Sequence, residues 1–88
     1  MSCYLISYDL RAPGRNYDQL YDAIKAYGTW AHIVESTWAI VTDQKASEIR
    51  DHLQAFVDAN DRIFVVKSGR EGAWANVLCK NEWLKENL

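Results

Sequence analysis

The feature that most constrains this chain is the order in which its hydrophobic pattern changes period. Residues 3–9 alternate side chains with the period of two that a strand requires, whereas residues 17–27 place apolar side chains at helical spacing. Residues 30–34 and 37–42 read as two strands joined by a short hairpin. A second helical pattern precedes residue 60, and a strand pattern over residues 62–67 follows it. The predicted order is therefore strand, helix, strand, strand, helix, strand.

Local signals support these boundaries. Pro13 and Gly14 break the first strand pattern, and Asn16 is a good N-cap for the first helix, with Gln19 placed to complete a capping box. Gly28 stands where a glycine ends a helix in the left-handed conformation. Residues 62–67 are nearly all apolar and β-branched at their centre, which is typical of a central strand buried on both faces.

This order predicts an α+β fold of the ferredoxin-like βαββαβ type, a sandwich with two helices on one face of a four-stranded antiparallel sheet in the order 4-1-3-2. The alternative is another small α+β packing. After a loop at residues 68–72, residues 73–78 are a candidate fifth, edge strand, and Asn81 is a candidate cap for a short final helix. The 88 residues allow one domain, 1–88.

The charge balance limits the classes of partner. Ten Lys and Arg against twelve Asp and Glu give a net charge of -2, whereas nucleic-acid-binding proteins usually carry a basic excess. Any site for a polyanion must therefore be a local patch. No apolar run reaches the length of a membrane span, and residues 1–8 lack the positive charge of a signal peptide. We expect a cytoplasmic protein with no membrane partner, in which Cys3 and Cys79 stay reduced.

The aromatic content favours a dimer. Four Trp and five Tyr are a heavy load for a chain of this length. A domain this small buries only about 60–65% of its unfolded surface, so some of these rings are expected to be exposed or covered by a second copy.

The predicted topology brings one group of polar side chains to a common end of the sheet. Asp9 ends the first strand, and His32, Glu35 and Ser36 surround the hairpin, near the loop that carries Arg11 and Arg15. One interpretation is that Asp9 holds a hard divalent cation such as Mg²⁺, which needs only one or two carboxylates. The other is that Asp9 accepts N–H bonds from the turn over residues 11–14.

Other candidate residues carry weaker patterns. His32 and His52 lack any spacing typical of zinc sites, so we expect His32 to pack or hydrogen-bond and His52 to lie on a helix surface. Four basic side chains either form a small phosphate-facing patch or lie singly in solvent. These are Arg11, Arg15, Lys67 and Arg70.

Several segments resemble the SinR-like group of small bacterial and phage proteins. The segments that carry this resemblance span residues 13–17, 23–25, 27–30, 36–38 and 82–88. A second resemblance is to the CRISPR-associated adaptation-subunit ("Cas-two") family. It is carried by residues 4–10, in which Asp9 ends the strand, and by residues 36–41. The two resemblances together cover most of the chain.

The resemblance implies a ferredoxin-like homodimer whose sheets face each other, with C-terminal segments exchanged or docked across the interface. It implies nucleic-acid association and a weak metal-dependent endonuclease activity, in which paired copies of Asp9 hold Mg²⁺ or Mn²⁺. By position only Asp9 carries over as a catalytic and metal residue, and Ser36 is its neighbour. Arg11 and Arg15, with Ser36, are the candidate nucleic-acid-binding residues, the two arginines because of their charge. The alternative is a non-catalytic protein-interaction or regulatory module, and the net charge of -2 departs from a DNA clamp.

Overall fold

The computed structural model describes residues 1–11 and 16–88. Their strands are β1 (Ser2–Asp9), β2 (Thr29–Val34), β3 (Thr37–Thr42) and β4 (Arg62–Lys67), and their helices are α1 (Asp18–Lys25), α2 (Ala46–Gln54) and α3 (Asn81–Asn87). The α+β class and the predicted order of the first six elements are confirmed. Within the two described ranges, no helix has both the length and the apolar character needed to cross a membrane.

The strands form one antiparallel sheet in the order β2-β3-β1-β4, which is 4-1-3-2 when read from the β4 edge. β1 lies between β3 and β4, with Asp9 opposite Arg62 and Ser7 opposite Phe64. β4 is therefore an edge strand. The prediction of a central strand buried on both faces is wrong for this chain, because only one face of β4 is covered by α2.

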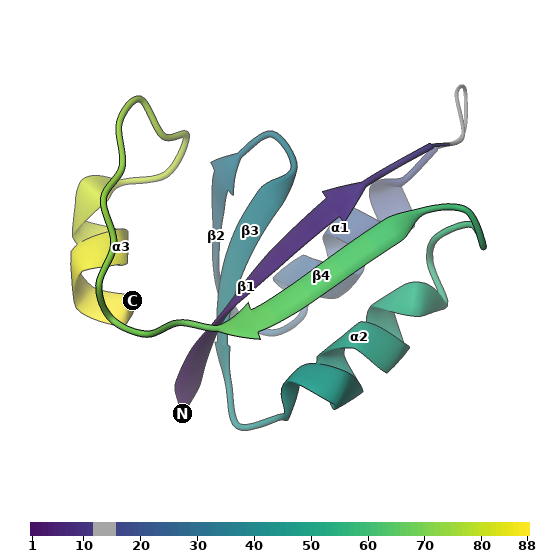
Figure 1. The fold of residues 1–88 in the computed structure, drawn as a ribbon, viewed down its shortest axis with the longest axis horizontal. Helices are drawn as coiled ribbons and strands as arrows, with labels where there is room; N and C mark the ends of the chain where they lie inside the picture. Colours follow the sequence, from purple (N-terminus) through teal and green to yellow (C-terminus); the bar gives the residue numbers. More distant parts are fainter. Residues whose placement is uncertain (12–15) are drawn as a thin grey trace.

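The hydrophobic core lies between α1, α2 and one face of the sheet (Figure 1). Leu20 and Ile24 of α1 and Leu53 of α2 are fully buried, because helical spacing puts them on the stripe that faces the strands. The sheet contributes alternate residues from its strands, as the period of two requires. These are Tyr4, Ile6, Trp38 and Ile40, with Ile63 and Val65 at the margin.

The ends of the helices differ in detail from the sequence expectation. The Asn16 side chain accepts the N–H of Asp18 at 2.7 Å, so Tyr17 is the N-cap and has no side-chain cap bond. The expected capping box from Asn16 is therefore wrong, since that side chain closes a local turn one residue earlier. Gly28 has a φ of 93°, which confirms the left-handed glycine after α1. The Pro13–Gly14 break lies outside the described residues.

The tail after β4 crosses to the β2 side of the molecule and ends in α3 (Figure 1). The candidate strand at residues 73–78 is wrong: Asn76 has a φ of 57°, which interrupts an extended chain. One backbone hydrogen bond, from Leu78 N–H to the Ile33 carbonyl at 2.8 Å, holds this segment to β2. The final helix is confirmed, although Lys80 is its N-cap and Asn81 instead accepts the Trp74 indole N–H at 3.1 Å.

Candidate functional site

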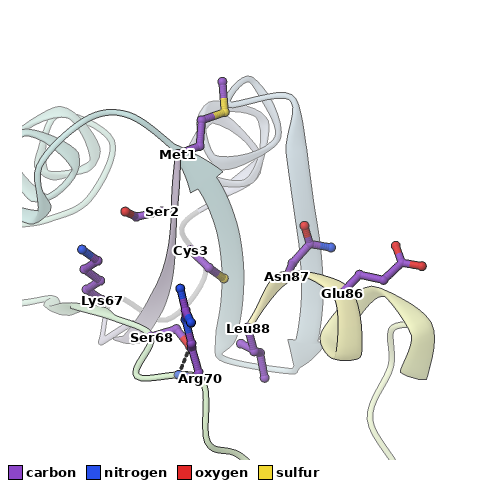
Figure 2. A pocket seen from close by; sticks show the side chains of 9 residues that line it. All are labelled: Met1, Ser2, Cys3, Lys67, Ser68, Arg70, Glu86, Asn87 and Leu88. Atoms are coloured by element: carbon purple, nitrogen blue, oxygen red, sulfur yellow. Dashed lines mark hydrogen bonds between the residues drawn. The ribbon is translucent and has the colours of Figure 1, made fainter.

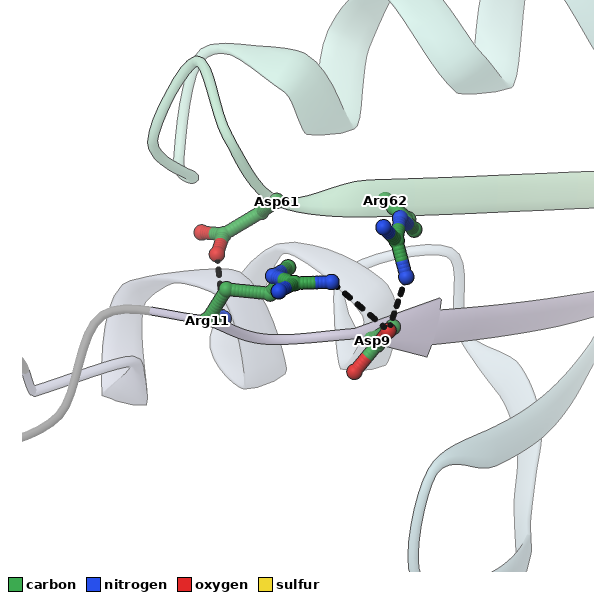
Figure 3. A network of polar contacts seen from close by, with 4 residues as sticks. All are labelled: Asp9, Arg11, Asp61 and Arg62. Atoms are coloured by element: carbon green, nitrogen blue, oxygen red, sulfur yellow. Dashed lines mark hydrogen bonds and ion pairs between the residues drawn. The ribbon is translucent and has the colours of Figure 1, made fainter.

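Asp9 lies at the end of β1, directly opposite the first residue of β4. Its Oδ2 accepts a hydrogen bond from Arg62 Nη1 at 2.9 Å and lies 3.9 Å from Arg11 Nη1 (Figure 3). The Asp9 side chain is 57% exposed, so these ion pairs are screened by water and contribute little to stability. The sequence reasoning missed Arg62. The signal that could have found it is the antiparallel register of the first and fourth strands, which pairs the end of one with the start of the other.

A second carboxylate, Asp61, fixes the chain beside Asp9. Its Oδ1 accepts the Arg11 N–H at 2.6 Å, and its Oδ2 accepts the Tyr17 hydroxyl at 2.7 Å and the Asp58 N–H at 2.8 Å (Figure 3 shows the first contact). Asp61 therefore joins the segment after β1, the start of α1 and the turn before β4. The prediction that Asp9 accepts the amides of its own turn is wrong for Arg11, because Asp61 accepts that amide.

The structure brings Asp9 close to the hairpin residues that the topology predicted. A surface pocket of about 460 Å³ is lined by Asp9, Glu35 and Ser36 together with Tyr8, Leu10 and Tyr21. His32 also lies at this end, and its Nε2 is 3.0 Å from the carbonyl oxygen of Glu35. Arg15, the other predicted nucleic-acid neighbour, lies outside the described residues.

The chemistry of the Asp9 end does not favour a cation in the single chain. The two guanidinium groups next to Asp9 repel a cation and compete for its carboxylate. Over residues 1–11 and 16–88, no three His, Cys, Asp or Glu side chains lie together as a metal-binding group. A cation bound at Asp9 would first have to displace Arg62 from its Oδ2 atom.

Tyr8 forms the inner wall of this pocket. Its hydroxyl donates to the Glu35 carbonyl at 3.2 Å and accepts the Trp38 indole N–H at 3.0 Å. Burial is the main cause that raises the pKa of Tyr8 to about 12, and the bond from Trp38 opposes it. Tyr8 is therefore neutral at physiological pH and acts as a hydrogen-bonding group rather than as a base.

His32 packs against the same tryptophan, as the sequence predicted. Its ring stacks on Trp38 with centroids 4.1 Å apart and planes 8° from parallel. His52 lies exposed on α2, where its Nδ1 is 2.9 Å from the Tyr27 hydroxyl, which confirms its predicted helix-surface position. The two histidines are thus held by aromatic neighbours on different elements.

The other predicted cations lie at the opposite end of β4. Lys67 and Arg70 line a pocket of about 440 Å³ together with Cys3 and the end of α3 (Figure 2). Because β4 spans six residues, at about 3.3 Å each, this pocket is roughly 17 Å from Arg62 and its neighbour Arg11. A single patch that joins Arg11 to Lys67 and Arg70 is therefore wrong. Cys3 is buried and free, and burial raises its pKa, whereas Cys79 is free and only half-buried.

The sheet face opposite α1 and α2 is only partly covered. Towards β2 the tail covers it, with Leu84 1% exposed and a cavity of about 260 Å³ between the tail, Leu5 and Ile33. Towards β4 it is bare: Phe64 is 63% exposed and Val66 is 40% exposed. We call this bare part the open face. It consists of alternate residues of β1 and β4, namely Ser7, Asp9, Arg62, Phe64 and Val66, and Leu5 lies at its border with the tail.

No family model matches the chain. Function is therefore inferred from the open face, the Asp9 end and the pockets of the described residues. The likeness to the SinR-like group and to the CRISPR-associated adaptation subunit stays a prediction.

Proposed function

We propose that this chain is a ferredoxin-like sandwich that acts as a homodimeric, non-catalytic interaction module, in which two copies meet through the open face. The observation that carries this proposal is the exposure of Phe64 at 63% on β4. Helix packing and strand order of the sandwich type support the fold part of the proposal.

The residues of β4 favour a strand whose open face is covered by a partner. Its central residues are apolar on both faces, whereas the open face of an edge strand that remains in solvent usually carries charges or proline. Phe64 and Val66 lie on the same face, two residues apart, beside Leu5 of β1. Covering them removes apolar surface from water at about 25 cal/mol for each Å², which favours association.

The charges of the open face support a second copy as its partner. One end of the face carries both an acid and a base, Asp9 and Arg62, and both side chains are more than half exposed. In a two-fold interface the same patch of each subunit meets the other, so each Asp9 can pair with an arginine of the partner. Tail exchange is not needed, because Leu84 is already buried against its own subunit.

The test is the mass of the particle in solution, measured by sedimentation equilibrium or light scattering from about 1 to 100 µM protein. We expect the wild-type chain to sediment as a dimer and the Phe64→Glu variant as a monomer, because a carboxylate at that position would be buried unpaired. Leu78→Glu is the matched control. Leu78 is 65% exposed but lies outside the open face, so this variant should remain a dimer.

Each outcome decides the proposal. A monomeric wild type at 100 µM, or a Phe64→Glu variant that keeps the wild-type mass, rejects the open face as the interface. Circular dichroism of both variants should match the wild type, because neither side chain belongs to the buried core.

A second candidate is a nucleic-acid-associated dimer with Mg²⁺ or Mn²⁺ between two copies of Asp9. The position of Asp9 at the end of the open face favours it, since a dimer in which the two β1 ends meet would bring two such carboxylates within reach of one another. The ion would polarise a phosphate and activate water. In each chain, Arg62 would then release Asp9 and become available to a phosphate oxygen.

This candidate has its own test. It predicts that Mn²⁺ raises the melting temperature of the dimer, that the protein shifts DNA or RNA in a gel at about 50 mM salt, and that Asp9→Asn abolishes the metal effect. Asp43→Asn is the control, because Asp43 is an exposed carboxylate paired only with the N-terminal amine among the described residues. Equal melting temperatures with and without Mn²⁺ would remove Asp9 as a metal ligand while leaving the open-face dimer intact.

A further inference from the structure

A pocket at the β2 edge combines tryptophan rings with lysine side chains. It has a volume of about 510 Å³ and lies between β2, the end of α1 and the start of α3. This volume is within the range of about 300–1,000 Å³ that is typical of small-molecule sites. Its lining residues are Lys25, Trp30, Ala31, His32, Trp38, Leu78, Cys79, Lys80 and Trp83.

Trp30 and Trp83 are the tryptophan rings of this pocket that a ligand can reach. Trp38 is 3% exposed and its ring is covered by His32 at 4.1 Å between centroids, whereas Trp30 is 37% exposed and its ring centroid is 5.5 Å from that of Trp38. Trp83 is half-buried and lines the pocket from α3. A planar ligand therefore meets aromatic surface that the sheet and α3 hold in position.

The charges select the kind of planar ligand. Lys25 Nζ lies 5.4 Å from the centroid of the Trp30 ring, and Lys80 lines the pocket from the other side. No carboxylate is among the described residues that line it, so a ligand cation of the type that aromatic cages bind would be repelled. A ligand with a flat ring and a negative group satisfies both the tryptophans and the lysines.

We propose that this pocket binds a nucleotide unit, with the base stacked against the exposed ring of Trp30 beside Trp83 and the phosphate held between Lys25 and Lys80. Aromatic platforms flanked by cations bind single-stranded nucleic acids in this way, because every base offers a π-face. The same chemistry is presented by a free nucleotide and by a nucleotide within a single strand. The site shares no residue with the open face and does not include Asp9, so it does not depend on either function proposed above.

The test is tryptophan fluorescence of the full chain during titration with AMP and, separately, with a ten-residue single-stranded oligodeoxythymidine. Stacking on tryptophan should quench the emission in a saturable way, and adenosine and ribose 5-phosphate should each bind at least about tenfold more weakly than AMP. Tight binding of AMP assigns the site to free nucleotides. Binding of the oligonucleotide at least about tenfold tighter than AMP assigns it to single strands.

Two variants link the signal to the pocket. The Lys25→Ala, Lys80→Ala double variant should weaken binding at least about tenfold and flatten its dependence on salt, since fewer counterions are released. Lys85→Ala is the control, because Lys85 is an exposed lysine of α3 that does not line the pocket. Trp30→Leu, which keeps an apolar side chain at the wall, should lose at least about fivefold in affinity.

Absence of saturable quenching by both ligands up to about 5 mM, which is a free energy of binding weaker than about 3 kcal/mol, rejects the site. Quenching that the double lysine variant leaves unchanged also rejects it, because the phosphate would then bind elsewhere.

Discussion

Removing the carboxylate of Asp61 should destabilise this fold, because this side chain joins three segments of the chain. Asp61 accepts the Arg11 N–H, the Tyr17 hydroxyl and the Asp58 N–H at 2.6–2.8 Å. Asp61→Asn keeps the shape of the side chain but replaces one acceptor oxygen by an NH₂ group. That group then faces a donor, so at least one charge-assisted hydrogen bond is lost.

The magnitude follows from these contacts. A hydrogen bond to a charged group contributes about 1.5–3 kcal/mol, and the partial exposure of Asp61 lets water replace part of it. We expect Asp61→Asn to lower the free energy of unfolding by about 2 kcal/mol. For a domain of this size, that corresponds to a fall in melting temperature of about 8–16 °C.

Urea denaturation followed by circular dichroism measures this change, with Asp51→Asn as the control. Asp51 is an exposed carboxylate of α2 that pairs only with its neighbour Arg50 among the described residues, so its variant should stay within about 0.5 kcal/mol of wild type. A double-mutant cycle of Asp61→Asn with Tyr17→Phe should give a coupling energy of about 1 kcal/mol. If Asp61→Asn is no less stable than Asp51→Asn, the role assigned to Asp61 is refuted.

Two further predictions test local features. Gly28→Ala should lower the free energy of unfolding by about 1 kcal/mol, because φ at this position is 93°, although an added Cβ would meet no atom within 4 Å. An added Cβ at Gly69 would also meet no atom within 4 Å, and its φ is not positive. Gly69→Ala should therefore lower the free energy of unfolding by less in the same urea assay. The pKa of Tyr8 is raised to about 12 from 10.0, so its contribution to stability is fully present below pH 10 and is lost as pH rises towards 12. Tyr8→Phe should be less stable than the wild type at pH 7, since it loses the hydrogen bonds to Glu35 and Trp38. Between pH 10 and 12, however, its melting temperature should fall less steeply than that of the wild type. A parallel fall in the wild type and the variant would contradict the titration assigned to Tyr8.

The regular elements could be read from local patterns. The bounds predicted for the third and fourth strands agree with Thr37–Thr42 and Arg62–Lys67, because each strand is bounded by polar or turn residues that end its pattern. Gly28 was found for the same reason, since a glycine after a helical pattern has one common structural role. The structure of the tail was harder to predict, because a positive φ at Asn76 leaves no sequence pattern that distinguishes residues 73–78 from a strand.

The site residues could be predicted only in part. Topology alone placed Asp9, Glu35 and Ser36 at one end of the sheet, and they line a common pocket. The partner of Asp9 could not be predicted from composition or spacing, because Arg62 is 53 residues away along the chain and meets it only through strand register. The same is true of the pocket at the β2 edge, where Lys25 and Lys80 come from two different helix ends.

The sequence by itself determined which segments become strands and helices and which of their faces are apolar, because hydrophobic period and turn residues act over a few positions. It also determined that β4 would be apolar on both sides. Only the tertiary structure decided that α2 covers one side of β4 while the tail crosses to β2 and leaves Phe64 in solvent. The physical reason is that a face is buried by whichever segment packs on it, and that choice depends on contacts between residues far apart in the chain.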